Sequence, residues 1–271
     1  MPASRSRSRG PKSAAPRERG RAFWPFVFIG LAAIAAVAIA TLPASLAKHF
    51  LPASVTAQDF SGSLWHGSAG TLMVNARNAG ALEWQLHPGA LLTLAIAADV
   101  HWVKGGFALD GVGRLDGHGF SAQNVRGGGP IEDLGSLGIG AGWRGTAAVK
   151  LDEIKGDFSA VSAATGDIQV TNLASNTLAG GSDLGDYDLT IAQGAMAADG
   201  SITAKLIDRG GPVQVQADIR FSPKEHSGLL SGTLMARAEA SPALRKQIDN
   251  LAQLRVRDSQ GRIPVEVEFT F

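Results

Sequence analysis

The stretch "PVQVQADIRF", residues 212–221, alternates apolar and polar side chains without a break. Successive side chains of an extended chain point to opposite faces, so the apolar members of this stretch share one face. They are Val213, Val215, Ala217, Ile219 and Phe221. The last stretch of the chain, "PVEVEFTF" at 264–271, repeats the pattern. Both predict strands with one buried and one solvated face, which is typical of antiparallel sheets.

Seven further segments are strand candidates, and glycine, asparagine, aspartate or proline stands in most of the gaps between them. They are residues 82–86, 93–102, 142–151, 167–173, 187–192, 200–207 and 228–240. The 34 glycines and the low aromatic content of 6% favour many tight turns over a helical bundle. The sequence therefore predicts a mainly β domain over 44–271, built on a curved, largely antiparallel sheet. We predict a seam between two halves of that sheet at the glycine-rich residues 127–142.

One segment, "SPALRKQIDNLAQL" at 241–254, has the pattern of a helix. Ser241 is a good N-cap residue, and Pro242 suits the first helical position. Four apolar side chains then recur at helical spacing on one side: Leu244, Ile248, Leu251 and Leu254. We predict one late amphipathic helix.

The N-terminal region divides into a basic tail and an apolar run. Residues 1–21 carry seven basic side chains and one acidic side chain among serine, proline and small residues, which predicts a disordered tail. No charge occurs between Arg21 and Lys48. About 20 apolar residues are enough for a helix to cross a bilayer, so residues 22–43 predict a transmembrane anchor. The basic flank predicts a cytoplasmic tail and an exported domain at 44–271.

The apolar run has two other interpretations. A cleavable signal peptide has a shorter apolar region, of about 7–15 residues, and a small-residue exit for which "SLA" at 45–47 could serve. The length of the run favours an uncleaved anchor. A buried helix of a soluble domain is the third interpretation, and the one-sided basic flank argues against it.

Composition and motifs give no sign of chemistry. Outside the tail, 18 basic and 23 acidic residues leave a net charge of −5, which does not favour a nucleic-acid partner. The chain has no cysteine, which excludes thiolate catalysis and thiolate metal ligands. The six histidines show neither helical metal-ligand spacing nor a carboxylate partner in the sequence, and neither a dinucleotide-binding nor a serine-elbow motif is present. We therefore predict a protein that is not an enzyme and that needs neither metal nor cofactor.

The tryptophans are the candidate contact residues. In "SGSLWHG", residues 61–67, we expect a strand that begins after Gly62 and directs Trp65 inward, together with Trp84 from the next hairpin. Large aromatic side chains are usually buried, but tryptophan is also enriched where proteins bind partners. Trp65, Trp84 and Trp143 are therefore predicted core residues and, alternatively, partner contacts.

The order of several motifs resembles a known family. The motifs are "TLPA" (41–44), "SGSLWHG" (61–67), "ALEWQLHPGALL" (81–92), "GPIEDLG" (129–135), "GWRGTAAV" (142–149), "LGDYDL" (184–189), "GGPVQV" (210–215) and "LAQLRVRDSQGRIPVEVEF" (251–269). This set resembles the N proteins of bacterial type II secretion systems, from the apolar run to the C-terminus. The resemblance is firmest at residues 41–149 and in the last stretch.

The resemblance implies a single-pass inner-membrane protein with a periplasmic C-terminal domain. It implies an accessory, scaffold-like part in the export of folded proteins across the outer membrane, with other type II secretion components of the inner membrane and periplasm as partners. An alternative hypothesis from the sequence pattern is a periplasmic lipid-handling protein of envelope biogenesis with a curved apolar sheet. Co-purified lipid would distinguish the two.

Overall fold

The computed structural model describes residue 37 and residues 40–51, 54–137, 142–157, 159–176, 181–192, 200–225, 227–252 and 257–270. The predicted tail and most of the predicted anchor lie outside these residues. Within the described part of the chain, no helix has the length and hydropathy that crossing a bilayer requires. The chain divides into two compact units, Met1–Thr41 and Leu42–Phe271, and the fold described below is that of the second unit.

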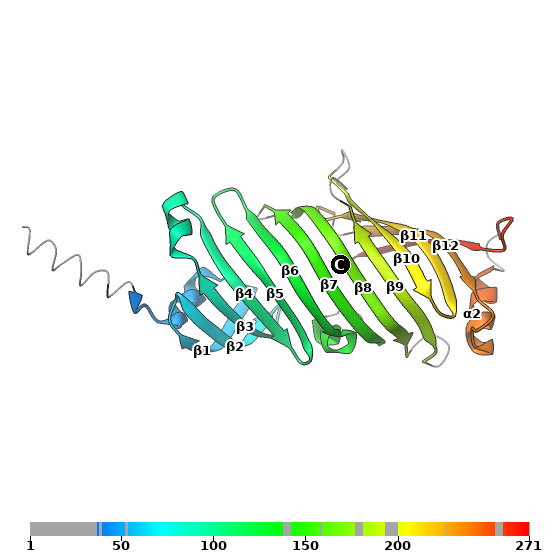
Figure 1. The fold of residues 1–271 in the computed structure, drawn as a ribbon, viewed down its shortest axis with the longest axis horizontal. Helices are drawn as coiled ribbons and strands as arrows, with labels where there is room; N and C mark the ends of the chain where they lie inside the picture. The colour runs from blue at the N-terminus through cyan, green and yellow to red at the C-terminus, as the bar shows by residue number, and fades with distance from the viewer. Residues whose placement is uncertain are drawn as a thin grey trace, which may run out of the picture. The chain divides into compact units, whose positions relative to one another are not determined.

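Thirteen strands form one sheet in which each strand pairs antiparallel with the next along the chain (Figure 1). They are β1 (Val55–Gly62), β2 (His66–Val74), β3 (Arg77–Leu86), β4 (Ile96–Lys104), β5 (Phe107–Leu115), β6 (Phe120–Pro130), β7 (Trp143–Gly156), β8 (Val161–Ser175), β9 (Asp183–Ile191), β10 (Ile202–Gly210), β11 (Val213–Ser222), β12 (Ser227–Ala236) and β13 (Ile263–Thr270). Among the described strands, β1 and β13 end the order, so this sheet is not closed. The predicted mainly β, antiparallel architecture is confirmed.

Among the described residues, four helical segments accompany the sheet: the short 3-10 helices η1 (Ala44–Phe50), η2 (Pro88–Thr93) and η3 (Ile131–Leu137), and the α-helix α2 (Pro242–Ala252). The predicted late helix is confirmed, and Ser241 caps it by accepting a hydrogen bond from the backbone N–H of Leu244 at 3.2 Å. Leu244 and Ile248 are buried as the pattern predicts, whereas Leu251 is half exposed. Leu254 lies outside the described residues. The described residues of the predicted seam, 127–137 and 142, belong to β6, η3 and the turn before β7. β6 pairs with β7, so the sheet continues across this region.

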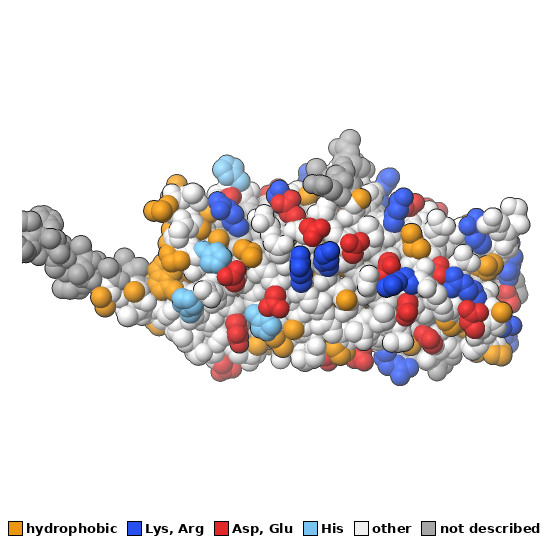
Figure 2. Space-filling model, viewed as in Figure 1, with side chains coloured by type: hydrophobic (Ala, Val, Ile, Leu, Met, Phe, Trp, Pro, Cys, Tyr) orange, Lys and Arg blue, Asp and Glu red, His pale blue; other side chains and the backbone are white. Residues whose placement is uncertain are grey.

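The strand register shows which side chains lie on each face of the sheet. Residues that lie directly opposite each other on neighbouring strands point to the same face. One such row contains a polar side chain on every strand: Ser61, Ser68, Glu83, His101, Asp110, Arg126, Lys150, Asp167, Thr190, Lys205, Asp218, Ser231 and Glu266. Figure 2 shows acidic and basic side chains spread together over this side of the strands.

The neighbouring row, on the other face, has no polar side chain. It consists of Phe60, Ala69, Leu82, Trp102, Leu109, Gly127, Val149, Ile168, Leu189, Leu206, Ala217, Gly232 and Val265. The two rows together explain why the alternating pattern "PVQVQADIRF" occurs: each strand must supply one side chain to a solvated face and the next to an apolar face.

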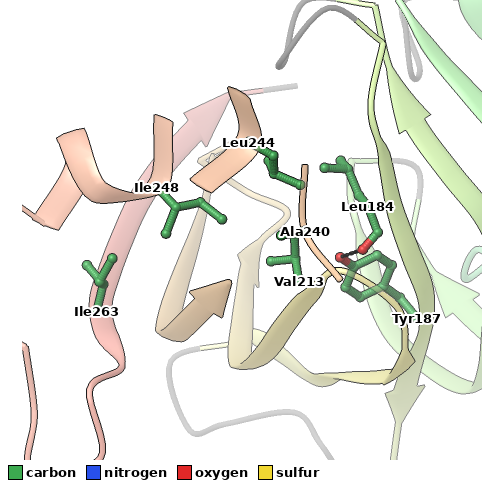
Figure 3. Packing of buried hydrophobic residues seen from close by; sticks show 7 residues of the cluster. All are labelled: Leu184, Tyr187, Val213, Ala240, Leu244, Ile248 and Ile263. Carbon is green, nitrogen blue, oxygen red and sulfur yellow. Dashed lines mark hydrogen bonds between the residues drawn. The ribbon is translucent and has the colours of Figure 1, made fainter. Parts of the chain in front are cut away.

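Two clusters of buried side chains lie on this apolar side. In the first, α2 places Leu244 and Ile248 against β9, β11 and β13, where Ile263 is only 1% exposed (Figure 3). In the second, Ile131 of η3 packs with Phe107 and Ala147. The helices therefore cover the apolar face over parts of its length, and burial of that area is the main source of stability.

Candidate functional site

In the segment "SLWHG", residues 63–65 form the turn between β1 and β2, and His66 and Gly67 begin β2, so the strand starts later than directly after Gly62 as the sequence predicts. Gly62 has a φ of +80°, in the left-handed region that ends an extended strand at low cost for glycine. Ser63 then donates its backbone N–H to the carbonyl of His66 at 2.9 Å, which closes the turn. A left-handed residue cannot be recognised from alternation alone, which is why the sequence pattern was misleading at this point.

The structure brings Trp65 and Trp84 together at this turn. Trp84 donates its indole N–H to the carbonyl of Leu64 at 2.8 Å, and the carbonyl of Trp65 accepts the backbone N–H of Leu86 at 2.7 Å. Both tryptophans are half-buried. The indole of Trp84 also meets the ring of Phe60 edge to face, with 6.4 Å between their centres. Two predicted contact residues thus fix the β1–β2 turn to β3.

Trp65 and Trp84 line a pocket of about 370 Å³ on the apolar side of the first five strands. Its walls are almost entirely hydrocarbon, and they include residues from η1 and η2 as well as β1 to β5. Such a pocket suits an apolar group, because it offers almost no hydrogen-bonding partner to a polar one.

Trp143 lies elsewhere, at the start of β7. It packs against both buried clusters, so it joins the α2 end of the apolar face to the η3 region. The structure therefore separates Trp143 from the Trp65 and Trp84 pair and gives it a packing role. The partner-contact prediction for the three tryptophans stays a prediction.

A second, larger pocket, of about 690 Å³, lies on the polar side of the same strands. Its side chains include His66, Glu83, His101, Asp110 and Asn124. His101 Nδ1 is 2.6 Å from an Asp110 carboxylate oxygen, and next to this pocket His87 Nε2 is 2.8 Å from an oxygen of Asp99. These carboxylate partners cannot be recognised from the sequence pattern, because the residues meet only when the strands pair.

In and beside this polar pocket, histidine and carboxylate side chains meet in pairs and form no larger catalytic or metal-binding group among the described residues. Within the described ranges, no group of three or more His, Cys, Asp or Glu side chains is placed to hold a metal ion. The His101 and Asp110 side chains are largely exposed, so water competes with their mutual attraction. The arrangement can bind a polar group by hydrogen bonds.

The most buried charged pair lies far along the sheet, between Asp208 and Arg237. Arg237 Nη2 is 2.5 Å from an Asp208 oxygen, and the Asp208 side chain is only 7% exposed. Nearby, Tyr187 donates its hydroxyl to the carbonyl of Leu184 at 2.7 Å (Figure 3). Burial, and then the negative charge of Asp208, raise the pKa of Tyr187 well above its usual range. These groups hold the sheet beside α2 and are not placed as a catalytic set.

Comparison with known proteins gives one result that bears on identity. The sequence matches the family described as "Type II secretion system (T2SS), protein N" over residues 53–266, which run from just before β1 into β13. No curated protein and no solved structure matches the chain. Because the matched region covers nearly the whole sheet and most of the chain, the chain belongs to the family of type II secretion system protein N.

Proposed function

We propose that this chain is a non-enzymatic, accessory scaffold component of a type II secretion system, acting in the export of folded proteins across the outer membrane. Its membership of the protein N family carries this proposal. Residues 22–43 anchor it once in the inner membrane, the basic tail 1–21 stays in the cytoplasm, and the sheet domain occupies the periplasm. Its partners are other type II secretion components of the inner membrane and the periplasm.

The sheet supports a scaffold role through its surfaces. An unbroken polar row crosses thirteen strands, and it carries charges of both signs, such as Arg126, Lys150 and Asp167. A long surface of this kind can bind partners through complementary charge without any reaction. The family match points to secretion and lends no support to the alternative of lipid handling in envelope biogenesis.

Deletion of the gene tests the secretion role. We expect the amount of secreted proteins in the medium to fall and the same proteins to accumulate in the periplasm, with both restored by a plasmid copy. Secretion that stays at the parental level without periplasmic accumulation would contradict the proposal. The intactness of the outer membrane is the control, because leakage would imitate secretion.

A second complementation test separates scaffold from catalyst. The double variant His101→Ala/Asp110→Asn removes the closest histidine–carboxylate pair of the polar pocket, at 2.6 Å. His101 and Asp110 are two positions of a polar row that crosses thirteen strands. A scaffold therefore keeps most of its partner surface, and we expect this variant to restore most of the secretion at equal protein level. Loss of secretion by a folded variant would argue for chemistry or ligand binding at that pair.

A further inference from the structure

The exposed large apolar side chains of the sheet domain are concentrated at one corner. Nine such side chains are described between Leu42 and Phe271, and six of them lie on η2 or beside it. We name these six the η2 patch: Leu91, Leu92, Leu94, Ile96, Leu115 and Phe120. Single exposed leucines are normal, whereas a contiguous group marks a surface that contacts something apolar.

The strand register makes the η2 patch continuous. Ile96 lies opposite Leu115, and Leu115 lies opposite Phe120, so these three side chains share one face. Leu92 and Leu94 are each 90% exposed at the turn that leads into β4. Figure 2 shows hydrophobic side chains at this corner, where Figure 1 places the turn before β4.

The apolar pocket extends the η2 patch toward η1. Leu91, Ile96 and Leu115 belong to both, and the pocket also includes Ala47 and Leu51, within and just after η1. Residue 44, where η1 begins, directly follows the proposed anchor at 22–43. If the anchor ends at residue 43, Ala47 and Leu51 of the pocket follow the bilayer within a few residues along the chain.

The charges around the η2 patch suit a phospholipid surface. Residues 88–98, which include η2, contain no Asp, Glu, Lys or Arg. Arg114 is exposed and donates to the Thr93 hydroxyl at 3.3 Å, and Lys48 is exposed in the last turn of η1. Two acids lie close to the patch in sequence: Asp116 directly follows Leu115, and Asp99 of β4 lies 2.8 Å from His87 Nε2. Apolar side chains edged by basic groups are typical of surfaces that enter the interface of anionic bilayers.

We infer that the η2 patch inserts into the headgroup and upper acyl region of an anionic phospholipid bilayer. This inference rests on the proposed function, since it takes residues 22–43 as the anchor. The patch is then a second attachment beside the anchor, and two attachments hold a domain in one orientation where a single flexible one does not. The surface contacts the bilayer and carries no lipid away from it.

The absence of cysteine permits a direct test. The full chain is reconstituted into vesicles of phosphatidylcholine and phosphatidylglycerol as the variants Leu92→Cys and Leu94→Cys, each labelled with an environment-sensitive fluorophore. Leu251→Cys is the matched control, because Leu251 is also an exposed leucine, on α2 and outside the patch. We expect a blue shift at 92 and 94 and loss of emission when the lipids carry brominated acyl chains, and neither effect at 251.

Each outcome of this experiment bears on the inference. If the chain floats with the vesicles but the labels at 92 and 94 behave like the label at 251, the inference is overturned. The patch is then assigned to a protein partner, and the proposed anchor is retained. A chain that does not float overturns both. Quenched labels together with unaffected secretion in the gene deletion support the lipid contact and contradict only the secretion role. Circular dichroism of each labelled variant shows that it is folded.

Discussion

Trp84 stabilises the first hairpins in two ways, through its ring and through its indole N–H. The ring lines the apolar pocket and meets Phe60, and the N–H satisfies the carbonyl of Leu64 in the β1–β2 turn. The same contact explains why residue 67 is a glycine. A Cβ at position 67 would lie 2.6 Å from the Trp84 ring, so only glycine fits beneath it without a shift.

Replacement of Trp84 separates these two contributions. Trp84→Ala removes the ring, and we expect the free energy of unfolding to fall by about 3 kcal/mol, the low end for tryptophan because the side chain is only half-buried. Trp84→Phe keeps most of the apolar surface and loses the hydrogen bond to Leu64, which costs about 1 kcal/mol. Urea unfolding monitored by circular dichroism measures both. Equal losses in the two variants would show that the ring contact is not the larger contribution.

The buried Asp208 has Arg237 as its cationic partner. Arg237→Met leaves a carboxylate that is 7% exposed without its cation, and we expect a loss of about 3 kcal/mol in the free energy of unfolding at neutral pH. Asp208→Asn/Arg237→Met removes the stranded charge and is the matched control. We expect it to recover most of the loss in the same urea titration. If Arg237→Met were as stable as the double variant, the ion pair would contribute little to the free energy of unfolding.

The turn between β7 and β8 shows how a short connection is held by one carboxylate. Asp157 accepts hydrogen bonds from the backbone N–H groups of Ser159 and Ala160, at 2.8 and 2.9 Å, and from the Ser159 hydroxyl. These bonds to the ionised form lower the pKa of Asp157 from 3.8 to about 2, with the Ser159 hydroxyl as the largest cause.

Acid should therefore loosen this turn. Because the folded pKa is depressed, the stabilisation is fully present above pH 3.8 and is lost as the pH falls toward about 2. We expect the carboxyl carbon resonance of Asp157 to titrate near pH 2. In Ser159→Ala we expect a higher midpoint that is still below the ordinary value, because the two backbone N–H donors remain. A midpoint near 3.8 in the parent chain would mean that the turn does not form as described. Asp157→Asn is the control for assignment of the resonance.

The sheet as a whole behaves as one two-faced layer. The polar row and the apolar row run from β1 to β13 without interruption by a strand crossover. Helices η3 and α2 cover parts of the apolar side, and the two buried clusters share Trp143 and Leu173 as neighbours. Packing is therefore linked from β4 to β13.

The proposed orientation of the molecule in the inner membrane is testable with the same absence of cysteine. We expect Glu225→Cys, exposed in the turn after β11, to react with a membrane-impermeant maleimide in spheroplasts. Ser8→Cys in the basic tail should react only after lysis, because basic flanks stay in the cytoplasm. Labelling of residue 225 only after lysis would reverse the proposed topology.

Much of the sheet was predictable, and the polar pocket was not. Alternation in "PVQVQADIRF" identifies β11 and its faces, because its period of two is a local property. The pairing of His101 with Asp110 depends on the two-residue turn of Gly105 and Gly106, which fixes the register of β4 on β5. Paired glycines between apolar runs are a recognisable turn signal, so this turn is one that the sequence could have predicted.

Local chemistry was enough to predict most of the strands, though not β1, β5 or β6, together with the late helix and its Ser241 cap and the order of motifs that marks the protein N family. These features depend on neighbours a few residues apart, so the printed sequence carries them. The thirteen-strand order, the pairing of Trp65 with Trp84, and the gathering of Leu92 with Phe120 at one corner required the folded chain. Each joins residues that are distant along the chain, and register between strands is set by the packing of the whole sheet.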